Sequence, residues 1–217
     1  MKNTIKVLII LLIIMHIAFY SDAGNNFPST DSSKKIHNPT LAFSLHPLYT
    51  IENGFRIDFE FHIYKNQWIV IGPQYFIAQN KSLEFFAGTD RYIDMEGYGV
   101  DFYHKIILKT EESVSGPYAA YGIRYNTFNF KSVADINTST TKLDVTNTRY
   151  GFNVMFGYQN AVNDKLLIDV YSGCGIQESN LTGDDDGTVK KNSNFFMNYN
   201  YSGPRFLLGF RIGLFLN

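Results

Sequence analysis

Apolar and polar residues alternate along most of this chain with a period of two. The clearest case is residues 55–63, where every second residue from Phe55 onward is apolar and the residues between are Arg, Asp, Glu and His. Residues 205–216 repeat the pattern, with an apolar side chain at every even position. A period of two places alternate side chains on opposite faces of a β-strand, whereas a helix needs a period near 3.6. The pattern therefore predicts an all-β protein.

Eight segments carry this alternation between residue 40 and the end of the chain. The predicted strands are residues 40–48, 54–63, 67–79, 97–109, 118–131, 148–160, 165–179 and 204–216. Most of them exceed the ~5–6 residues usual in soluble sheets and match the ~9–11 tilted residues with which a strand crosses a bilayer. The predicted fold is an antiparallel up-and-down transmembrane β-barrel of about eight strands.

The predicted connections alternate between short and long. Residues 64–66 form a tight join, whereas residues 80–96, 132–147 and 180–203 form long ones. An outer-membrane barrel has short periplasmic turns and longer external loops, so the three long joins are predicted to lie outside the cell. The join at residues 49–53 is short and does not follow this rhythm.

Alternation alone leaves open which face of the strands is turned outward. A soluble lipocalin-type barrel points its apolar set inward, whereas a membrane barrel points that set to lipid and has a polar interior. Glycines share the parity of the charged residues, at Gly97, Gly99, Gly122, Gly151, Gly157, Gly173, Gly175, Gly209 and Gly213. Glycine only weakens a solvated strand, but inside a narrow barrel it makes room for large neighbours. The membrane barrel is favoured, and a soluble periplasmic ligand-binding barrel is an alternative.

The N-terminus has the layout of a secretory signal peptide. Lys2 and Lys6 precede an apolar run at residues 7–19, and Ser21 and Ala23 supply the small residues of a cleavage site. The run is shorter than the ~20 apolar residues of a spanning helix. The predicted organisation is a signal peptide at residues 1–23, a flexible N-terminal arm at residues 24–39 and an outer-membrane barrel at residues 40–217.

Composition narrows the class of partner. The chain carries 19 basic and 20 acidic residues, and this balance lacks the basic footprint of a nucleic-acid-binding protein. Cys174 is the single cysteine, so no intrachain disulfide can form, and it is expected to be inert packing. Aromatic residues make up 16% of the chain, which suits a barrel with much side-chain surface to bury or to turn to lipid.

Two runs carry a resemblance to a known class. Residues 53–60 and residues 204–213 resemble the small outer-membrane barrels common in Bacteroidota, which are related in architecture to OmpA/OmpX-like barrels. The resemblance covers residues 40–217. It implies residence in the cell outer membrane, contact with outer-membrane lipids and insertion by the barrel-assembly machinery. Arg211, Gly213 and Leu216 match part of the C-terminal strand signal that this machinery reads, whereas the terminal Asn217 departs from it.

The polar parity gathers six cations and four anions inside the predicted barrel. This interior charge network comprises Arg56, Asp58, Glu60, Asp101, Lys105, Arg124, Arg149, Asp169, Arg205 and Arg211. An unpaired buried charge is costly, and eight strands leave an interior just wide enough for side chains. A plug of salt bridges is predicted, with His62 as a further member, and a narrow charge-selective pore is the alternative.

No catalytic, cofactor-binding or metal-binding residue is predicted. Membrane-embedded lipid-modifying enzymes use a Ser-His-acid constellation, and here His46 merely shares a face with Ser44. The acidic run before Gly187 fails the ligand spacing of a calcium loop. The predicted role is structural, or a surface interaction with a glycan or protein through the long loops, and a lipid-modifying enzyme is the alternative. Candidate contact residues in those loops are Phe85, Phe86, Tyr92, Phe195, Phe196 and Tyr199.

Overall fold

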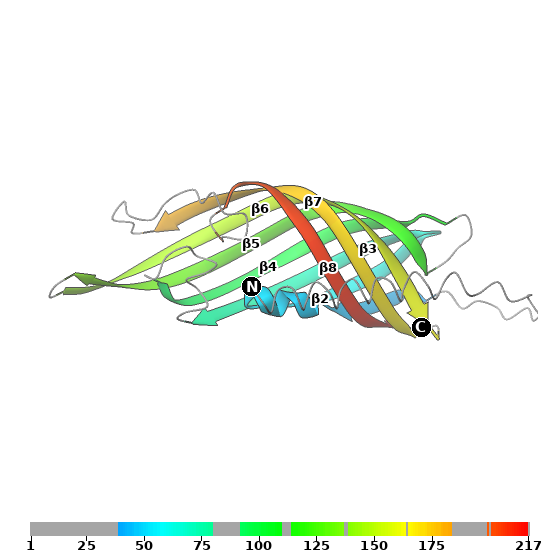
Figure 1. Ribbon diagram of the computed structural model, residues 1–217, viewed down its shortest axis with the longest axis horizontal. Coiled ribbons are helices and arrows are strands. Elements are labelled where there is room, and N and C mark those ends of the chain that lie inside the picture. Colours follow the sequence, from blue (N-terminus) through cyan, green and yellow to red (C-terminus); the bar gives the residue numbers. More distant parts are fainter. Residues whose placement is uncertain are drawn as a thin grey trace, which may run out of the picture. The chain divides into compact units, whose positions relative to one another are not determined.

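Eight antiparallel strands close into one barrel in simple up-and-down order (Figure 1). The computed structural model describes residues 39–79, 92–109, 114–136, 139–163, 165–183, 199 and 201–216. The elements are β1 (Leu41–Leu45), the 3-10 helix η1 (Pro47–Glu52), β2 (Gly54–Tyr64), β3 (Gln67–Gln79), β4 (Tyr92–Ile107), β5 (Gly116–Ile136), β6 (Ser139–Val162), β7 (Leu166–Gly183) and β8 (Gly203–Leu216). The predicted fold class, strand number and strand order are confirmed.

The ends of the predicted organisation lie partly outside the described residues. Residues 1–38, which include the predicted signal peptide and nearly all of the predicted arm, are not described. Asn38–Asn217 form a compact unit of their own. Among the described residues, no helix has the length and apolar character needed to span a membrane.

The largest difference from the sequence prediction is the length of β5 and β6. Residues 132–147 were expected to form a long external loop, but the backbone ladder continues through them as far as the pair Ile136–Ser139. The segment is rich in threonine and valine, whose β-branched side chains favour strands. Its many polar residues are typical of a loop, which is why the sequence predicts one. In the folded barrel the two halves of the segment pair with each other and form a hairpin.

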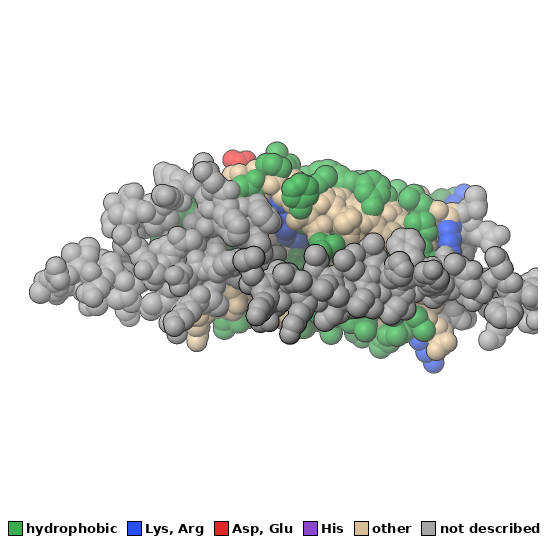
Figure 2. All heavy atoms as spheres, viewed as in Figure 1, with side chains coloured by type: hydrophobic (Ala, Val, Ile, Leu, Met, Phe, Trp, Pro, Cys, Tyr) green, Lys and Arg blue, Asp and Glu red, His purple; other side chains and the backbone are tan. Residues whose placement is uncertain are grey.

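The two faces of the barrel wall differ sharply in chemistry. Most charged side chains in the middle of the strands point inward and are almost completely buried, as for Asp58 and Glu60 on β2. Large apolar side chains point outward and are exposed on all eight strands, for example Leu45, Phe59, Ile71, Phe102, Ile123, Phe152, Ile176 and Leu208. Figure 2 shows hydrophobic side chains spread along the visible outer surface of the strands.

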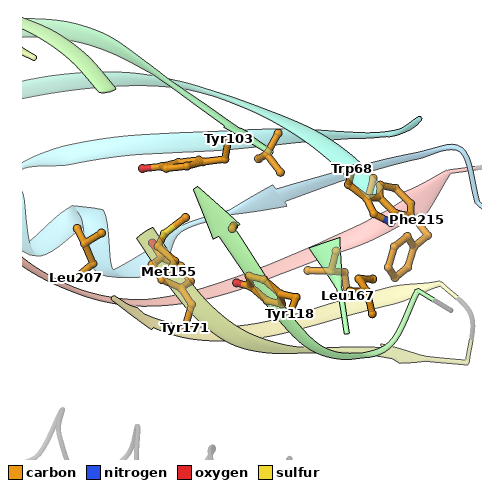
Figure 3. Close-up of a cluster of buried hydrophobic side chains, with 12 residues drawn as sticks. Trp68, Tyr103, Tyr118, Met155, Leu167, Tyr171, Leu207 and Phe215 are labelled. Atoms are coloured by element: carbon orange, nitrogen blue, oxygen red, sulfur yellow. The ribbon is translucent and has the colours of Figure 1, made fainter. Parts of the chain in front are cut away.

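Apolar layers fill the interior near both ends of the barrel. We call the end with the tight joins after β2 and β6 the turn end, and the opposite end the loop end. A cluster that reaches the turn end includes Trp68, Ile107, Leu167 and Phe215 (Figure 3), and its Trp68 and Phe215 rings lie 6.4 Å apart. A second cluster at the loop end consists of Tyr49, Phe76, Ala78, Met95, Phe128, Phe130, Val145 and Tyr199. The first cluster also extends inward among the charged residues, because it includes Tyr103 and Tyr118.

Inward glycines accept tyrosine rings from the neighbouring strand. Tyr171 is paired directly with Gly209, and a Cβ atom at Gly209 would lie 1.9 Å from the Tyr171 Cζ atom. Tyr118 is paired with Gly157 in the same way, and the corresponding distance is 2.5 Å. At either position a Cβ atom would force the tyrosine ring to move away from the wall. The glycines therefore let tyrosine side chains lie flat against the inner wall and reach the charges at the barrel centre.

Candidate functional site: the interior charge network

Asp101 on β4 is the most heavily hydrogen-bonded carboxylate of the network. Arg124 donates to both of its oxygens, from Nε at 2.8 Å and from Nη2 at 2.7 Å. Arg56 donates to Oδ2 from Nη1, Gln74 donates to Oδ1 at 2.6 Å, and the Tyr103 hydroxyl donates to Oδ2 at 2.8 Å. Two-point arginine contacts of this kind are among the stronger hydrogen bonds in proteins. Asp101 thus joins residues of β2, β3, β4 and β5.

Asp58 on β2 is the second centre of the network. Arg56 donates to it from Nε at 2.5 Å and from Nη2 at 3.0 Å, so that one guanidinium bridges Asp58 and Asp101. Arg211 on β8 donates from Nη1 at 3.1 Å. His46 Nε2 lies 2.7 Å from Oδ2. Asp58 thus links Arg56 on β2 to Arg211 on β8 and to His46 after β1, at the seam between β1 and β8.

The part of the network nearer the turn end is centred on Lys105. Its Nζ atom lies 2.7 Å from a Glu60 oxygen and 3.5 Å from Asp169 Oδ2, and it stands 4.5 Å from the centre of the Tyr118 ring. Arg211 pairs with both carboxylates, at 3.2 Å from Glu60 and in direct contact with Asp169. The Tyr118 hydroxyl donates to Asp169 at 2.8 Å. These side chains are buried, so mutual pairing takes the place of water around them.

Eight of the ten predicted residues form one charge-balanced cluster. The four cations are Arg56, Lys105, Arg124 and Arg211, and the four anions are Asp58, Glu60, Asp101 and Asp169. Equal numbers matter because the cost of burying charge is offset only when each charge has a partner. The remaining two arginines, Arg149 and Arg205, lie nearer the loop end. Arg149 stands 4.4 Å from the centre of the Phe128 ring, and Arg205 donates to Gln177 at 2.9 Å.

Several members of the network could not be picked out by charge. Tyr103, Tyr118 and Gln74 sit on inward positions of their strands and complete the hydrogen bonds of the carboxylates. Tyr49 belongs to η1, and its hydroxyl accepts hydrogen bonds from Arg56 at 2.9 Å and Arg124 at 2.6 Å. Inward parity is the only sequence signal for the first three residues, and Tyr49 has none because the sequence predicts a short join at residues 49–53.

Two expectations about single residues are wrong. His62 is not part of the network: it lies half-buried near the turn end, contacts the Lys65 carbonyl and stacks 5.0 Å from Trp68. His62 is paired with the inward Trp68, the last regular pair before the β2–β3 register shift at the turn end, so Trp68 and not a charged residue is its neighbour. Cys174 is not packed but exposed, because it occupies an outward position on β7 opposite Phe206.

The six aromatic residues predicted as loop contacts do not share one location in the structure. Phe85, Phe86, Phe195 and Phe196 lie outside the described residues, and Tyr92 is the first residue of β4. Tyr199 was expected on the outer surface but is 2% exposed, inside the loop-end cluster. Its ring packs against Phe128 and Arg149, and its carbonyl accepts a hydrogen bond from Asn147 at 2.6 Å. The chain before β8 is therefore anchored to the inner wall.

A serine, a histidine and an aspartate meet near the end of β1. His46 contacts Asp58 through Nε2, and its Nδ1 atom lies 3.4 Å from the Tyr171 hydroxyl. Ser44 is directly opposite Asp58 in the ladder, and its hydroxyl has no hydrogen-bond partner within the described residues. All three are at least 96% inaccessible to solvent. No substrate can reach a hydroxyl in that position without a change in the wall.

Other binding chemistry is scarce where the chain is described. No group of three or more His, Cys, Asp or Glu suitable for a metal ion occurs in that part of the chain. The acidic run at residues 184–186 lies outside it. In comparisons with known proteins, no family model and no curated protein matches this chain. The barrel wall and its interior are thus the features from which function has to be argued.

Proposed function

We propose that this protein is an exported outer-membrane β-barrel, of the small type found in Bacteroidota, whose interior is closed by the charge network. Its role is structural or a surface interaction through the loop end. One observation carries the proposal: large apolar side chains are exposed on all eight strands, while the eight charged side chains of the balanced cluster are buried inside. Water around such a barrel would be unfavourable on every side, whereas lipid would match it.

The height of the apolar surface supports placement in a bilayer. On β8 the outward side chains from Phe206 to Leu216 are all apolar. At ~3.3 Å per residue this stretch runs about 33 Å along the strand. A tilt of about 40° reduces it to roughly 25 Å along the barrel axis, the height of the lipid-facing band in outer-membrane barrels.

An aromatic band near the loop end supports the same placement. Phe55, Tyr75 and Tyr98 follow one another across neighbouring strands, and Tyr125 and Tyr150 are paired further round. All five are exposed on the outer surface. Beyond the band most outward side chains are polar, with Ile77 as an exception, and the Tyr75 hydroxyl donates to Glu96 at 3.1 Å. Tyrosine at such a boundary has its ring in the apolar layer and its hydroxyl in water.

The closed interior rests on the balance and extent of the network. Its members come from β2, β4, β5, β7 and β8 and meet across the lumen. Buried apolar side chains fill the interior around it and toward both ends of the barrel. We expect planar-bilayer recordings of the refolded protein to show no steady conductance, and a large, stable open channel would contradict the closed interior.

The membrane placement is tested by fractionation of the native cells. The protein should appear in the outer-membrane fraction, require detergent for extraction and migrate faster unheated than heated on denaturing gels. Recovery in the periplasmic fraction without detergent would favour the soluble ligand-binding barrel instead. Truncation of the loops that follow β3 and β7 should abolish any glycan or protein binding while the heat-modifiable band persists.

The proposal includes no catalytic role. The buried Ser44, His46 and Asp58 would be the candidates for a lipid-modifying enzyme, but the Asp58 carboxylate is also held by Arg56 and Arg211. We expect Ser44→Ala to leave the composition of the membrane lipids unchanged. An altered lipid profile in cells that carry this variant, with normal barrel levels, would support the enzyme.

Barrel assembly and lipid contact complete the proposed partners. The lipid-facing belt would contact outer-membrane lipids, and the C-terminal strand β8 would be read by the barrel-assembly machinery. Arg211 and Gly213 occupy inward positions on that strand and alternate with outward apolar residues. This combination of polar, glycine and apolar positions fits the C-terminal strand that the machinery recognises. Depletion of the assembly machinery should lower the amount of heat-modifiable protein in the membrane.

A further inference from the structure

The seam between β1 and β8 covers only part of β8. Leu41–Leu45 pair with β8 from Leu216 to Ile212. β8 itself begins at Gly203, and β7 pairs with it over that whole length. On the edge that faces β1, no described residue continues the ladder beyond Ile212. Within the part of the chain that the structure describes, the loop-end half of β8 therefore has one paired edge and one edge without a strand partner, which we call the open edge.

The backbone groups on the open edge can be identified from the ladder. The Phe215 N–H donates to the Lys165 carbonyl at 2.8 Å, which shows that odd residues of β8 turn their backbone groups toward β7. The alternation of an antiparallel strand turns the even residues the other way. The N–H and C=O groups of Phe206 and Leu208 thus point to the open edge, where no described backbone group bonds them. Such groups are costly in an apolar medium and are a template for another strand.

Pro47 explains why β1 stops short of this edge. If the register of the pair Leu45–Ile212 continued, Pro47 would lie opposite Phe210. Proline has no N–H to donate to the Phe210 carbonyl. Instead, the chain turns into η1, with His46 as N-cap and Pro47 in the first turn. Figure 1 draws η1 as the coil after β1, and it contacts both β2 and β8.

Tyr49 holds η1 to the interior. Its side chain is buried, and its hydroxyl accepts hydrogen bonds from both Arg56 and Arg124. Its ring centre lies 6.1 Å from that of Phe76 and 5.3 Å from the Arg56 guanidinium. The segment that could continue β1 is therefore fixed inside by the same arginines that bind Asp101.

We propose that the open edge of β8 and η1 form a lateral gate in the barrel wall, and that Tyr49 is the latch that holds this gate open. In the latched state η1 is turned inward, Tyr49 is bound to Arg56 and Arg124, and the edge of β8 is unpaired. In the second state residues 46–50 extend β1, which brings Leu48 opposite Gly209 and Tyr49 opposite Leu208. The strand predicted from the sequence runs to residue 48, three residues past the end of β1, and so covers the first part of this extension.

Gate closure and interior packing are coupled through Tyr49. Extension of β1 satisfies the backbone of β8 but withdraws Tyr49 from Arg56 and Arg124. When the wall is closed, the interior therefore loses the contacts of Tyr49. When the wall is open, those contacts are kept. The inference goes beyond the proposed function and rests on it only for the medium outside the gate. Phe206, at 82% exposed, stands on the outer side of the opening.

The gate is tested by nuclear magnetic resonance of the refolded protein in detergent micelles. In the native sequence, the Phe206 and Leu208 amides should exchange at least roughly a hundredfold faster than those of Leu207 and Gly209, which bond to β7. In Pro47→Ala, which restores the missing donor, exchange at Phe206 and Leu208 should slow. A cross-strand Hα contact between residues 48 and 209 should appear at the same time.

Two results would overturn the proposal. Equal protection of odd and even amides in the native sequence would mean that the edge is already paired. A folded Pro47→Ala protein with unchanged exchange would mean that β1 cannot extend. Should Pro47→Ala fail to fold, Tyr49→Phe decides with the same measurements, because loss of two hydrogen bonds should raise the extended state roughly tenfold or more. The control is Tyr64→Phe at an exposed site, and equal effects of the two tyrosine variants would exclude the latch.

Discussion

The inner and outer faces of β2 are built on different physical demands. The inner face carries Arg56, Asp58 and Glu60, each of which needs a particular partner from a distant strand. The outer face carries Phe55, Phe59 and Phe61, which are exposed and need only an apolar medium. At inner positions the stability of the barrel therefore depends on contacts between particular residues. At outer positions it depends only on whether the side chain is apolar. Substitutions on the two faces should fail for different reasons and by different amounts.

The largest effect is expected from removal of an inner anion. Asp101→Ala would leave Arg56 and Arg124 without their shared carboxylate, and loss of one partner from a buried pair costs about 3–5 kcal/mol. Urea unfolding in detergent micelles measures the free energy of unfolding. Asp94→Ala, on the outward parity of the same strand and only partly buried, is the control and should change it by no more than about 0.5 kcal/mol. Similar losses for both would contradict the distinction between the faces.

A charge placed on the outer face should impair insertion according to its depth. Phe152→Arg puts a cation within the apolar belt, which costs about 2–4 kcal/mol at a bilayer midplane. Thr148→Arg, on the same face of β6 but beyond Tyr150, is the matched control and should insert nearly as the native protein does. The yield of heat-modifiable barrel in vesicles measures the difference. Insertion of both variants at the native level would mean that Phe152 does not face lipid.

An intermediate effect is expected where the inner wall is tightly packed. Gly209→Ala would force the Tyr171 ring away from the wall, and overpacking of this kind costs about 1–3 kcal/mol. Ser172→Ala, next to Tyr171 but facing outward, should be almost neutral in the same unfolding assay. Combination of Gly209→Ala with Tyr171→Ala should cost less than the sum of the single changes. Strict additivity would show that ring and glycine are not coupled.

The smallest effect is expected at the polar border of the outer face. Tyr75→Phe removes the hydroxyl that donates to Glu96, and an exposed hydrogen bond of this kind contributes about 0.5–1 kcal/mol or less. Tyr103→Phe removes a hydroxyl that donates to the buried Asp101 and should cost more, because a buried carboxylate loses a donor. A larger loss for Tyr75→Phe than for Tyr103→Phe in micelle unfolding would reverse the expected order of the faces.

The alternation of residue types alone was enough to predict the fold class and most of the interior. A strand has a side-chain period of two, so parity assigned Arg56, Asp58, Asp101, Lys105 and the other charges to one face without knowledge of any contact. Strand number and order followed from the spacing of these segments. The same parity placed the glycines on the inner face, where Gly157 and Gly209 accept the rings of Tyr118 and Tyr171.

Only the tertiary structure decided how the charges are divided and where strands end. Strand pairing across the lumen groups eight charges into a balanced cluster and leaves Arg149 with the aromatic side chains of the loop end. The β5–β6 hairpin extends through a polar segment because each strand supplies the hydrogen bonds of the other. η1 turns inward because Pro47 cannot donate to β8 and Tyr49 can bind two arginines. Each of these outcomes depends on partners distant in sequence, which a local pattern of residue types does not encode.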